Sequence, residues 1–278
     1  TMKPFFSIII PVYNGISNDL TICLESIWKQ NLSPDLYEVI CIDDCSTDDT
    51  RSYMQQEQEK HPNLKVRFNT ENLRQGGGKN VGIRAAAGEY ILFIDQDDYY
   101  HSNVFNACHE ILLEQPLEVL VCDSAWQQKG KESNVLQLNY PCTDILDGRN
   151  FIQKNGFALA PWRMICQREY LLKNQLFFQE KVRIEDIDWG CRLVMLAKKI
   201  KYQPVLLVHY NRYEAQTTGL MKSSFDILRD QMFAAWRIYQ FAMTVEDPYP
   251  PLEGLWKHHY RVAIRMMLGC YAPVKIKS

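Results

Sequence analysis

The chain has 278 residues, enough for one or two domains with a hydrophobic core. Its residues are 46% hydrophobic and 23% charged, a composition that excludes collagen-like, low-complexity and largely disordered proteins. The formal net charge of −2 at pH 7 argues against a protein that binds nucleic acid in bulk, because contacts with phosphates require an excess of basic side chains.

The sequence also argues against membrane spans and against disulfide or zinc frameworks. No apolar run reaches the roughly 18 residues that a transmembrane helix needs, and the first residues lack the basic region and cleavage site of a signal peptide. We therefore expect a cytoplasmic protein. The nine cysteines form no CxxC pair and mostly lie in apolar runs, so reduced thiols in the core are expected.

The first 125 residues alternate continuous apolar runs with helical patterns, which is typical of a parallel sheet covered on both faces. Apolar side chains at helical spacing occur between the runs, for example at Leu20, Leu24 and Ile27. Connections of this length form right-handed βαβ units, so we predict a doubly wound, mostly parallel α/β sheet. The predicted strands are 5–10, 38–43, 64–69, 89–95 and 118–123.

Shorter elements follow Trp126. We expect a helix near 147–155, an amphipathic helix at 184–197 and a strand at 202–210. From Ser224 the pattern is helical, with a break at 247–251 and a last basic helix over about 254–271.

Two carboxylates end the second predicted strand, in the run DDCSTDDT (43–50). Asp43 and Asp44 point to opposite faces of the strand, so one of them must face the crevice at the end of the sheet, where ligands of such sheets bind. We assign Asp44 to the crevice. Helix capping is sufficient to explain the polar residues from Ser46 to Asp48.

A second acidic run, DQDD (95–98), also ends an apolar strand. Asp95 and Asp97 lie one strand repeat apart and face the same way. This arrangement suits a divalent cation such as Mn²⁺ or Mg²⁺, held partly by carboxylates and partly by a diphosphate. The alternative is a solvated acidic turn, because a DxD pattern alone has little specificity.

A glycine cluster lies between these runs, in NLRQGGGKNVG (72–82). The P-loop pattern fails because Leu73 stands where a glycine is needed, and the dinucleotide-binding pattern fails for the same reason at Val81. We therefore expect a flexible turn, flanked by Arg74 and Lys79, that approaches a sugar or a diphosphate closely.

The run PVYN (11–14), the DDCSTDDT run, the glycine run and DQDD, in this order and spacing, resemble the motifs of glycosyltransferase family 2, a family of inverting enzymes with the GT-A fold. IEDIDWGCRL (184–193) resembles the acidic motif on the acceptor helix of the family, and VHYNRYEAQTTG (208–219) resembles its closing segment. The resemblance covers roughly the first 220 residues.

This resemblance implies a GT-A catalytic domain over 1–223, in which 1–125 binds the nucleotide sugar and 126–223 binds the acceptor. A C-terminal helical extension, 224–278, follows without motifs of the family.

The resemblance also implies roles for individual residues. Tyr13 and Asp44 would contact the nucleoside base, Asp95 would lie beside the ribose, Asp97 would hold the metal and Asp186 would be the catalytic base. The remaining candidates for substrate binding are Pro11, Arg74, Gly78, Lys79, Glu185, Trp189 and Arg192.

Several of these candidates have a structural alternative. Trp189 and Arg192 either line the acceptor site or pack in the core, and His209 either approaches the metal or is a buried structural histidine. The glycine run of the family usually ends in Arg-Asn, whereas this chain has Lys79 before the asparagine. A lysine keeps the charge but not the bidentate geometry of an arginine.

The function implied is transfer of a sugar from a nucleotide-sugar donor, with a UDP-sugar preferred, to a hydroxyl of a glycan or lipid-linked acceptor in cell-surface polysaccharide synthesis. A sugar-phosphate nucleotidyltransferase would need a glycine-rich basic loop after the first strand, where PVYNGISND stands instead. A non-catalytic nucleotide-sugar-binding relative would be expected to have lost an acid from the DxD or ED pair.

The tail carries a basic stripe. Residues 251–278 contain five Lys or Arg residues against the single acid Glu253, and Lys257, Arg261 and Arg265 recur every four positions. A basic amphipathic helix lies well at the interface of an anionic membrane, which predicts peripheral membrane contact through 252–278. The alternative is a helix packed on the catalytic domain or on a second subunit of a homo-oligomer.

Overall fold

The computed structural model describes residues 3–128, 134–136, 138–212 and 225–267. Parts of the predicted closing segment 208–219 and of the tail 252–278 therefore lie outside the described residues, as does the boundary predicted at 223. None of the described helices combines the length and the apolar character needed to cross a membrane.

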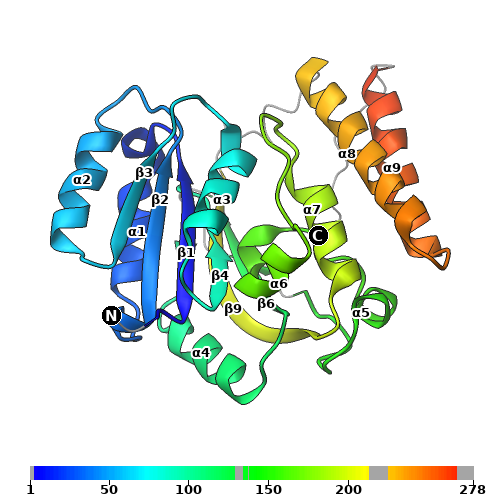
Figure 1. Ribbon diagram of the computed structural model, residues 1–278, viewed down its shortest axis with the longest axis horizontal. Coiled ribbons are helices and arrows are strands. Elements are labelled where there is room, and N and C mark those ends of the chain that lie inside the picture. Colours follow the sequence, from blue (N-terminus) through cyan, green and yellow to red (C-terminus); the bar gives the residue numbers. More distant parts are fainter. Residues whose placement is uncertain (1–2, 129–133, 137, 213–224, 268–278) are drawn as a thin grey trace.

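The elements largely follow the expected order (Figure 1). The strands are β1 (Phe6–Val12), β2 (Tyr37–Asp43), β3 (Leu64–Phe68), β4 (Tyr90–Phe93), β5 (Tyr99–Tyr100), β6 (Val119–Gln128), β7 (Asn134–Leu136), β8 (Met164–Gln167) and β9 (Ile200–Arg212). The α-helices are α1 (Leu20–Trp28), α2 (Thr50–Lys60), α3 (Arg74–Ala85), α4 (Val104–Glu114), α5 (Gly148–Asn155), α6 (Arg168–Lys173), α7 (Asp186–Leu196), α8 (Phe225–Thr244) and α9 (Pro250–Met267). Short 3₁₀ helices are η1 (Gly15–Asn18), η2 (Pro34–Leu36) and η3 (Pro161–Arg163).

All described strands belong to one sheet, in the order β3-β2-β1-β4-β8-β6-β9-β5, with β7 paired to β6. Strands β3, β2, β1 and β4 are mutually parallel, as predicted, and β6 is parallel to β9. Strand β8 is antiparallel to both of its neighbours, and the short β5 is antiparallel to β9. The sequence did not indicate these reversals, because the apolar pattern of a buried strand is the same in either direction.

Helices cover both faces of the sheet, which explains why β1 and β2 are buried along their whole length. One core cluster joins a face of the sheet to α1, α2 and α4, for example through Leu24, Met54 and Phe105. The other cluster joins the opposite face to α3, α5, α6 and α7, for example through Ile83 and Trp189. The prediction of a sheet covered on both faces is confirmed.

The glycine run forms helix α3 and not the flexible turn that we expected. Its glycines bring the helix close to its neighbours, because a Cβ on Gly82 would lie 2.3 Å from Ile9 of β1 and a Cβ on Gly76 would lie 2.2 Å from the carbonyl oxygen of Gln179. The close packing of α3 against its neighbours therefore explains the glycines. Their helix propensity does not, because glycine has a low one.

Helices α8 and α9 form a hairpin beside α7 (Figure 1). The hairpin is joined to α7 by an ion pair in which Nε of Arg237 lies 2.9 Å from the carboxylate of the buried Asp188. The break at 247–251 is confirmed within a few residues, since α8 ends at Thr244 and α9 begins at Pro250. The last helix packs on α8, and its Leu252 belongs to the core cluster that includes α7. Membrane contact through 252–278 stays a prediction.

Candidate active site

Three of the predicted motifs meet at one edge of the sheet, because β2, β1 and β4 are adjacent and parallel. The backbone nitrogen of Asp44 donates to the carbonyl oxygen of Val12 at 2.8 Å, which places Asp44 beside the start of the turn that contains Tyr13. The side chain of Asn14 in the same turn accepts from the backbone nitrogen of Thr47 at 2.8 Å. Tyr13 and Asp44 therefore follow neighbouring parallel strands, and their predicted contact with a nucleoside base stays a prediction.

The DQDD turn is fastened to the PVYN turn by one side chain. The amide of Gln96 accepts from the backbone nitrogen of Tyr13 and donates to its carbonyl oxygen, each at 2.9 Å. The ring of Tyr13 itself is 46% exposed. A flat aromatic face is thus presented at the strand ends, available to stack on a nucleoside base.

The two acids at the end of β2 have different surroundings, as the alternation of a strand requires. Asp43 is fully buried, and its carboxylate pairs with Nε of Arg51 at 2.6 Å. Asp44 is 3% exposed and accepts from the backbone nitrogen of Leu73 at 2.8 Å and from Asn69 at 2.9 Å. Asp44 therefore connects β2 to the start of α3.

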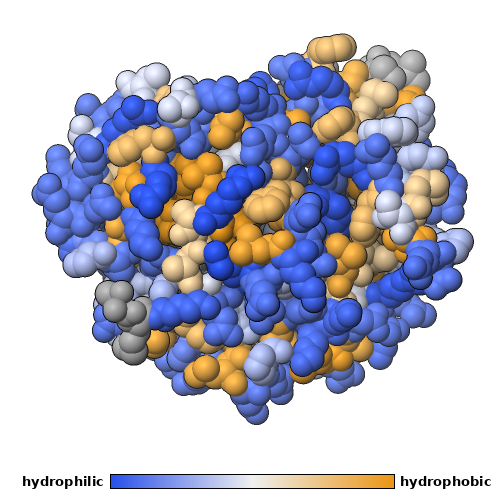
Figure 2. Space-filling view, viewed as in Figure 1, coloured by the Kyte–Doolittle hydropathy of each residue, from blue (hydrophilic) through white to orange (hydrophobic). Residues whose placement is uncertain are grey.

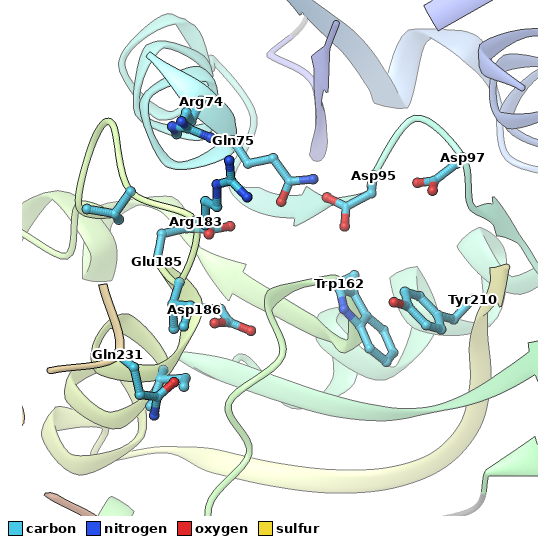
Figure 3. Close-up of a pocket in the computed structure, with 13 residues that line it drawn as sticks. Arg74, Gln75, Asp95, Asp97, Trp162, Arg183, Glu185, Asp186, Tyr210 and Gln231 are labelled. Carbon is cyan, nitrogen blue, oxygen red and sulfur yellow. The ribbon is translucent and has the colours of Figure 1, made fainter. Parts of the chain in front are cut away.

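A cavity of about 560 Å³ opens between this edge and the N-terminal end of α7 (Figure 3). Five of the predicted site residues line it, namely Arg74, Asp95, Asp97, Glu185 and Asp186. Figure 3 shows Asp95 and Asp97 on one side of the cavity and Asp186 on another. The DxD and ED pairs, about ninety residues apart in sequence, therefore share one cavity.

A buried lysine connects these acidic pairs. The Nζ atom of Lys79 lies 2.9 Å from Oε1 of Glu185 and 3.8 Å from Oδ1 of Asp95, and the lysine is 3% exposed. Burial alone would lower the pKa of Lys79, but the carboxylates of Glu185 and Asp95 outweigh it and raise that pKa. Lys79 is not among the residues that line the cavity, and its ammonium group bridges Glu185 and Asp95. Its predicted contact with the donor stays a prediction.

Asp186 is the first residue of α7 and lines the cavity. Burial raises its pKa to about 7, and the neighbouring Glu185 adds to the effect while Lys79 opposes it. A carboxylate with a pKa near neutrality is matched to accepting a proton from a hydroxyl.

The acids at the end of β4 differ in exposure. Asp95 and Asp97 reach the cavity, whereas Asp98 is 1% exposed and accepts from the backbone nitrogen of Asn211 in β9 at 2.8 Å. Burial, followed by the charges of Asp97 and Asp95, raises the pKa of Asp98 well above its usual range. Asp98 therefore ties the DQDD turn to β9 and supports the position of Asp97.

The donor set fits a divalent ion bound jointly by protein and ligand. Within the described ranges, no three His, Cys, Asp or Glu side chains lie together as a complete metal site. Mg²⁺ and Mn²⁺ commonly take only one or two carboxylates, with phosphate and water oxygens completing the shell. The carboxylates of Asp95 and Asp97, at the rim of a cavity large enough for a nucleotide sugar, match that mode.

The structure adds residues that the sequence analysis missed. Trp162 of η3 and Tyr210 of β9 line the cavity with their rings stacked, 5.4 Å between centroids and 12° between planes. Arg183 and, from α8, Gln231 also line it (Figure 3). Tyr210 lies in the segment that resembles the family's closing motif, but no pattern in the sequence singled out Trp162, Arg183 or Gln231.

Four residues that were predicted to bind substrate, Pro11, Gly78, Trp189 and Arg192, are not among the residues that line the cavity. They pack around it. Trp189 is fully buried and donates to the carbonyl oxygen of Leu176, and Arg192 donates to the carbonyl oxygen of Phe177. A Cβ on Gly78 would lie 3.0 Å from Cβ of Pro11, so these two residues form a contact between α3 and β1. Trp189 and Arg192 therefore pack against neighbouring parts of the chain in this structure, which is the structural alternative to lining the acceptor site.

His209, the second predicted metal ligand, is also outside the residues that line the cavity. Its ring stacks on Tyr99, and its Nε2 lies 3.0 Å from Nδ1 of His101. Burial, followed by the charge of His101, lowers the pKa of His209 and favours the neutral imidazole. A metal-ligand role for His209 stays a prediction.

Comparisons with known proteins show which proteins the chain is similar to. Over 198 residues the chain is 31% identical to a poly(ribitol-phosphate) β-glucosyltransferase of Bacillus spizizenii, an alignment that covers 70% of this chain but only 30% of that enzyme. The crystal structure of residues 1–349 of Staphylococcus aureus TarS in complex with UDP-GlcNAc superposes with a TM-score of 0.75 at 23% identity, covering 98% of this chain and 76% of that one.

A second structure, a Pyrobaculum calidifontis mannosyltransferase in complex with GDP-Man and Mn²⁺, has a TM-score of 0.62 at 17% identity, covering 99% of this chain and 77% of that one. These structures share the GT-A fold with this chain. The model of glycosyl transferase family 2 matches residues 7–174, more than half of the chain. The chain therefore belongs to glycosyl transferase family 2.

Proposed function

We propose that the chain transfers a sugar from a nucleoside-diphosphate sugar to an acceptor hydroxyl, with inversion at the anomeric carbon. The observation that carries this proposal is the position of Asp186, whose pKa is raised to about 7, in one cavity with Asp95 and Asp97. As general base, Asp186 removes the proton of the acceptor hydroxyl while that oxygen attacks the anomeric carbon. One displacement from the side opposite the leaving group inverts configuration and needs no second carboxylate as nucleophile.

The chain's acids also suit the leaving group. Asp97, with Asp95 beside it, would hold Mn²⁺ or Mg²⁺, and that ion would neutralise charge on the departing nucleoside diphosphate. Asp98 fixes this turn against β9 through its bond with Asn211. The ion pairs of Lys79 keep Glu185 close to Asp95. They therefore fix the position of the proposed base, Asp186, relative to the metal-binding turn.

We propose that the nucleoside base of the donor is uracil. The exposed ring of Tyr13 and the buried carboxylate of Asp44 lie at neighbouring strand ends, as a stacking surface and a hydrogen-bond acceptor for one base. TarS, which shares the fold, was crystallised with UDP-GlcNAc and with UDP.

The acceptor side is formed by the stacked Trp162 and Tyr210 and by Gln231. Aromatic faces pack against the C–H faces of sugar rings, and polar groups beside them bind hydroxyls. We propose a glycan or lipid-linked acceptor in the synthesis of cell-surface polymers, the class that includes the poly(ribitol phosphate) named for the Bacillus relative. A cytoplasmic location is part of this proposal.

Release of nucleoside diphosphate tests the proposal. The protein is incubated with UDP-glucose, UDP-GlcNAc or GDP-mannose and Mn²⁺, with and without polyol-phosphate and glycan acceptors. We expect UDP release from a UDP-sugar, stimulated by acceptor, retained by the exposed control Asp35→Ala and abolished by Asp97→Ala.

Three other results would contradict parts of it. Full turnover in excess EDTA would exclude the metal role. Tight calorimetric binding of UDP without any turnover would indicate a non-catalytic relative, and formation of UTP from a UDP-sugar and pyrophosphate would indicate a nucleotidyltransferase.

A further inference from the structure

Helices α8 and α9 enclose an apolar groove of about 820 Å³. Its lining includes Phe225, Phe233, Trp236, Trp256 and Tyr260. Phe225 is 78% exposed, Trp236 is 52% exposed and Tyr260 is 46% exposed, and apolar residues are visible along this hairpin among hydrophilic ones (Figure 2). Large exposed apolar patches of this kind mark sites of interaction with another surface.

The side chains of α8 that line the groove lie on a different face of the helix from the side chains that pack on the domain. The buried side chains of α8 include Ile227, Asp230, Ala234 and Ile238, which lie on another stripe of the helix. Asp230 accepts from the backbone nitrogen of Arg183 at 2.8 Å. Helix α8 therefore contacts the active-site region with one stripe and presents aromatic side chains on the other.

Charge is unevenly distributed along the hairpin. The two helices are antiparallel, since Gln231 bonds to His259 and Ile227 packs near Met266. The half nearer the active site therefore carries the exposed Arg261 and Arg265, for which the described residues supply no ion-pair partner. The same half of α8 carries Asp226 and Arg229, which pair with each other, and the opposite end of the hairpin carries the acids Glu246, Asp247 and Glu253, of which Glu253 pairs with Lys257.

The basic stripe of α9 borders its aromatic stripe. Lys257 and Arg261 each follow one residue after Trp256 and Tyr260, about 100° further around the helix. Aromatic side chains with a polar edge favour the boundary between acyl chains and headgroups, and arginines beside them meet lipid phosphates.

We propose that this groove docks on the surface of a bilayer that contains anionic phospholipids. The sequence predicted such contact for 252–278, and in the structure most of the residues that line the groove belong to α8. Because Gln231 of α8 lines the active-site cavity, docking would hold that cavity close to the membrane. The proposal does not depend on the reaction proposed above, and its test uses no sugar.

Vesicle sedimentation of the full chain tests it. We expect binding to vesicles of phosphatidylcholine with phosphatidylglycerol at low salt, weaker binding at high salt, and little binding to phosphatidylcholine alone. The double variants Phe233→Ala with Trp236→Ala, and Arg261→Glu with Arg265→Glu, should each lower the partition coefficient by about tenfold or more.

Matched controls separate this surface from general effects of charge and hydrophobicity. Leu113→Ala changes an exposed apolar residue on α4, and Lys198→Glu with Lys199→Glu makes the same change in net charge far along the chain from the hairpin. Both controls should bind vesicles like the unaltered protein. The proposal would be overturned if the protein did not bind vesicles at low salt, or if the control variants lost as much vesicle binding as the groove variants. It would also be overturned if light scattering showed a dimer that Trp236→Ala dissociates.

Discussion

The two sides of the cavity are constructed differently. On the proposed donor side, short runs that follow β1, β2 and β4 are joined by bonds between side chains and backbone, such as the pair of bonds between Gln96 and Tyr13. On the proposed acceptor side, single residues come from η3, β9 and α8. The proposed donor side is therefore built from adjacent strand ends, whereas the proposed acceptor side depends on the relative positions of three separate elements.

Loss of the base should give the largest effect, because Asp186 acts where the two sides meet. Asp186→Asn should lower kcat by about 10²–10⁴, the usual contribution of general-base catalysis. Affinity for UDP, measured by calorimetry, should barely change, since the donor side is intact. The exposed Asp49→Asn serves as a control, and a wild-type transfer rate in Asp186→Asn would reduce Asp186 to a residue that favours the helix N-terminus.

Removing the lysine that joins the two sides should cost stability. Lys79→Met leaves the buried carboxylate of Glu185 without its cation, and breaking a buried ion pair costs about 3–5 kcal/mol of unfolding free energy. Urea denaturation measures this loss. Lys181→Met removes an exposed ion pair with Glu71 and should leave the midpoint unchanged. Equal midpoints for the two variants would mean that Lys79 is not a structural link.

The pH dependence of turnover sharpens the same point. The base must be ionised, so kcat should fall about tenfold per pH unit below the pKa of Asp186, which is about 7, and level off above it. Because Lys79 lowers that pKa, the acid limb should move to higher pH in Lys79→Met. An unchanged limb in Lys79→Met would show that Asp186 does not set it.

The sequence predicted the position of the acids at the strand ends for a physical reason. Asp44, Asp95 and Asp97 interrupt continuous apolar strands, so the points where polar chemistry begins are visible in the pattern. The parallel half of the sheet follows from the same runs. Strand direction in β8 was not predictable, since buried strands of either direction look alike.

The proposed acceptor side was less predictable because its residues have ordinary surroundings in sequence. Gln231 lies in a helical pattern and Trp162 is an isolated aromatic residue between predicted elements, and only the fold brings them together. Lys79 was recognised as important, but its burial depends on the glycines that let α3 approach Gln179 and β1. The glycine run was therefore visible in the sequence, whereas the close approach of α3 to its neighbours, which requires the glycines, was not.

The smallest effect is expected at Gln231. Burial, followed by the charge of His258, lowers the pKa of His259 to about 4, so a neutral His259 accepts from the amide nitrogen of Gln231 at 2.5 Å through Nδ1. That bond fixes the amide and leaves its oxygen to accept from an acceptor hydroxyl. One neutral hydrogen bond is worth about 0.5–1.5 kcal/mol, so Gln231→Ala should raise the KM for acceptor by about two- to tenfold and leave the KM for donor unchanged. Met232→Ala, one residue further along α8 and outside the cavity lining, should change neither constant. A rise in the donor KM alone would place Gln231 on the donor side and remove α8 from acceptor recognition.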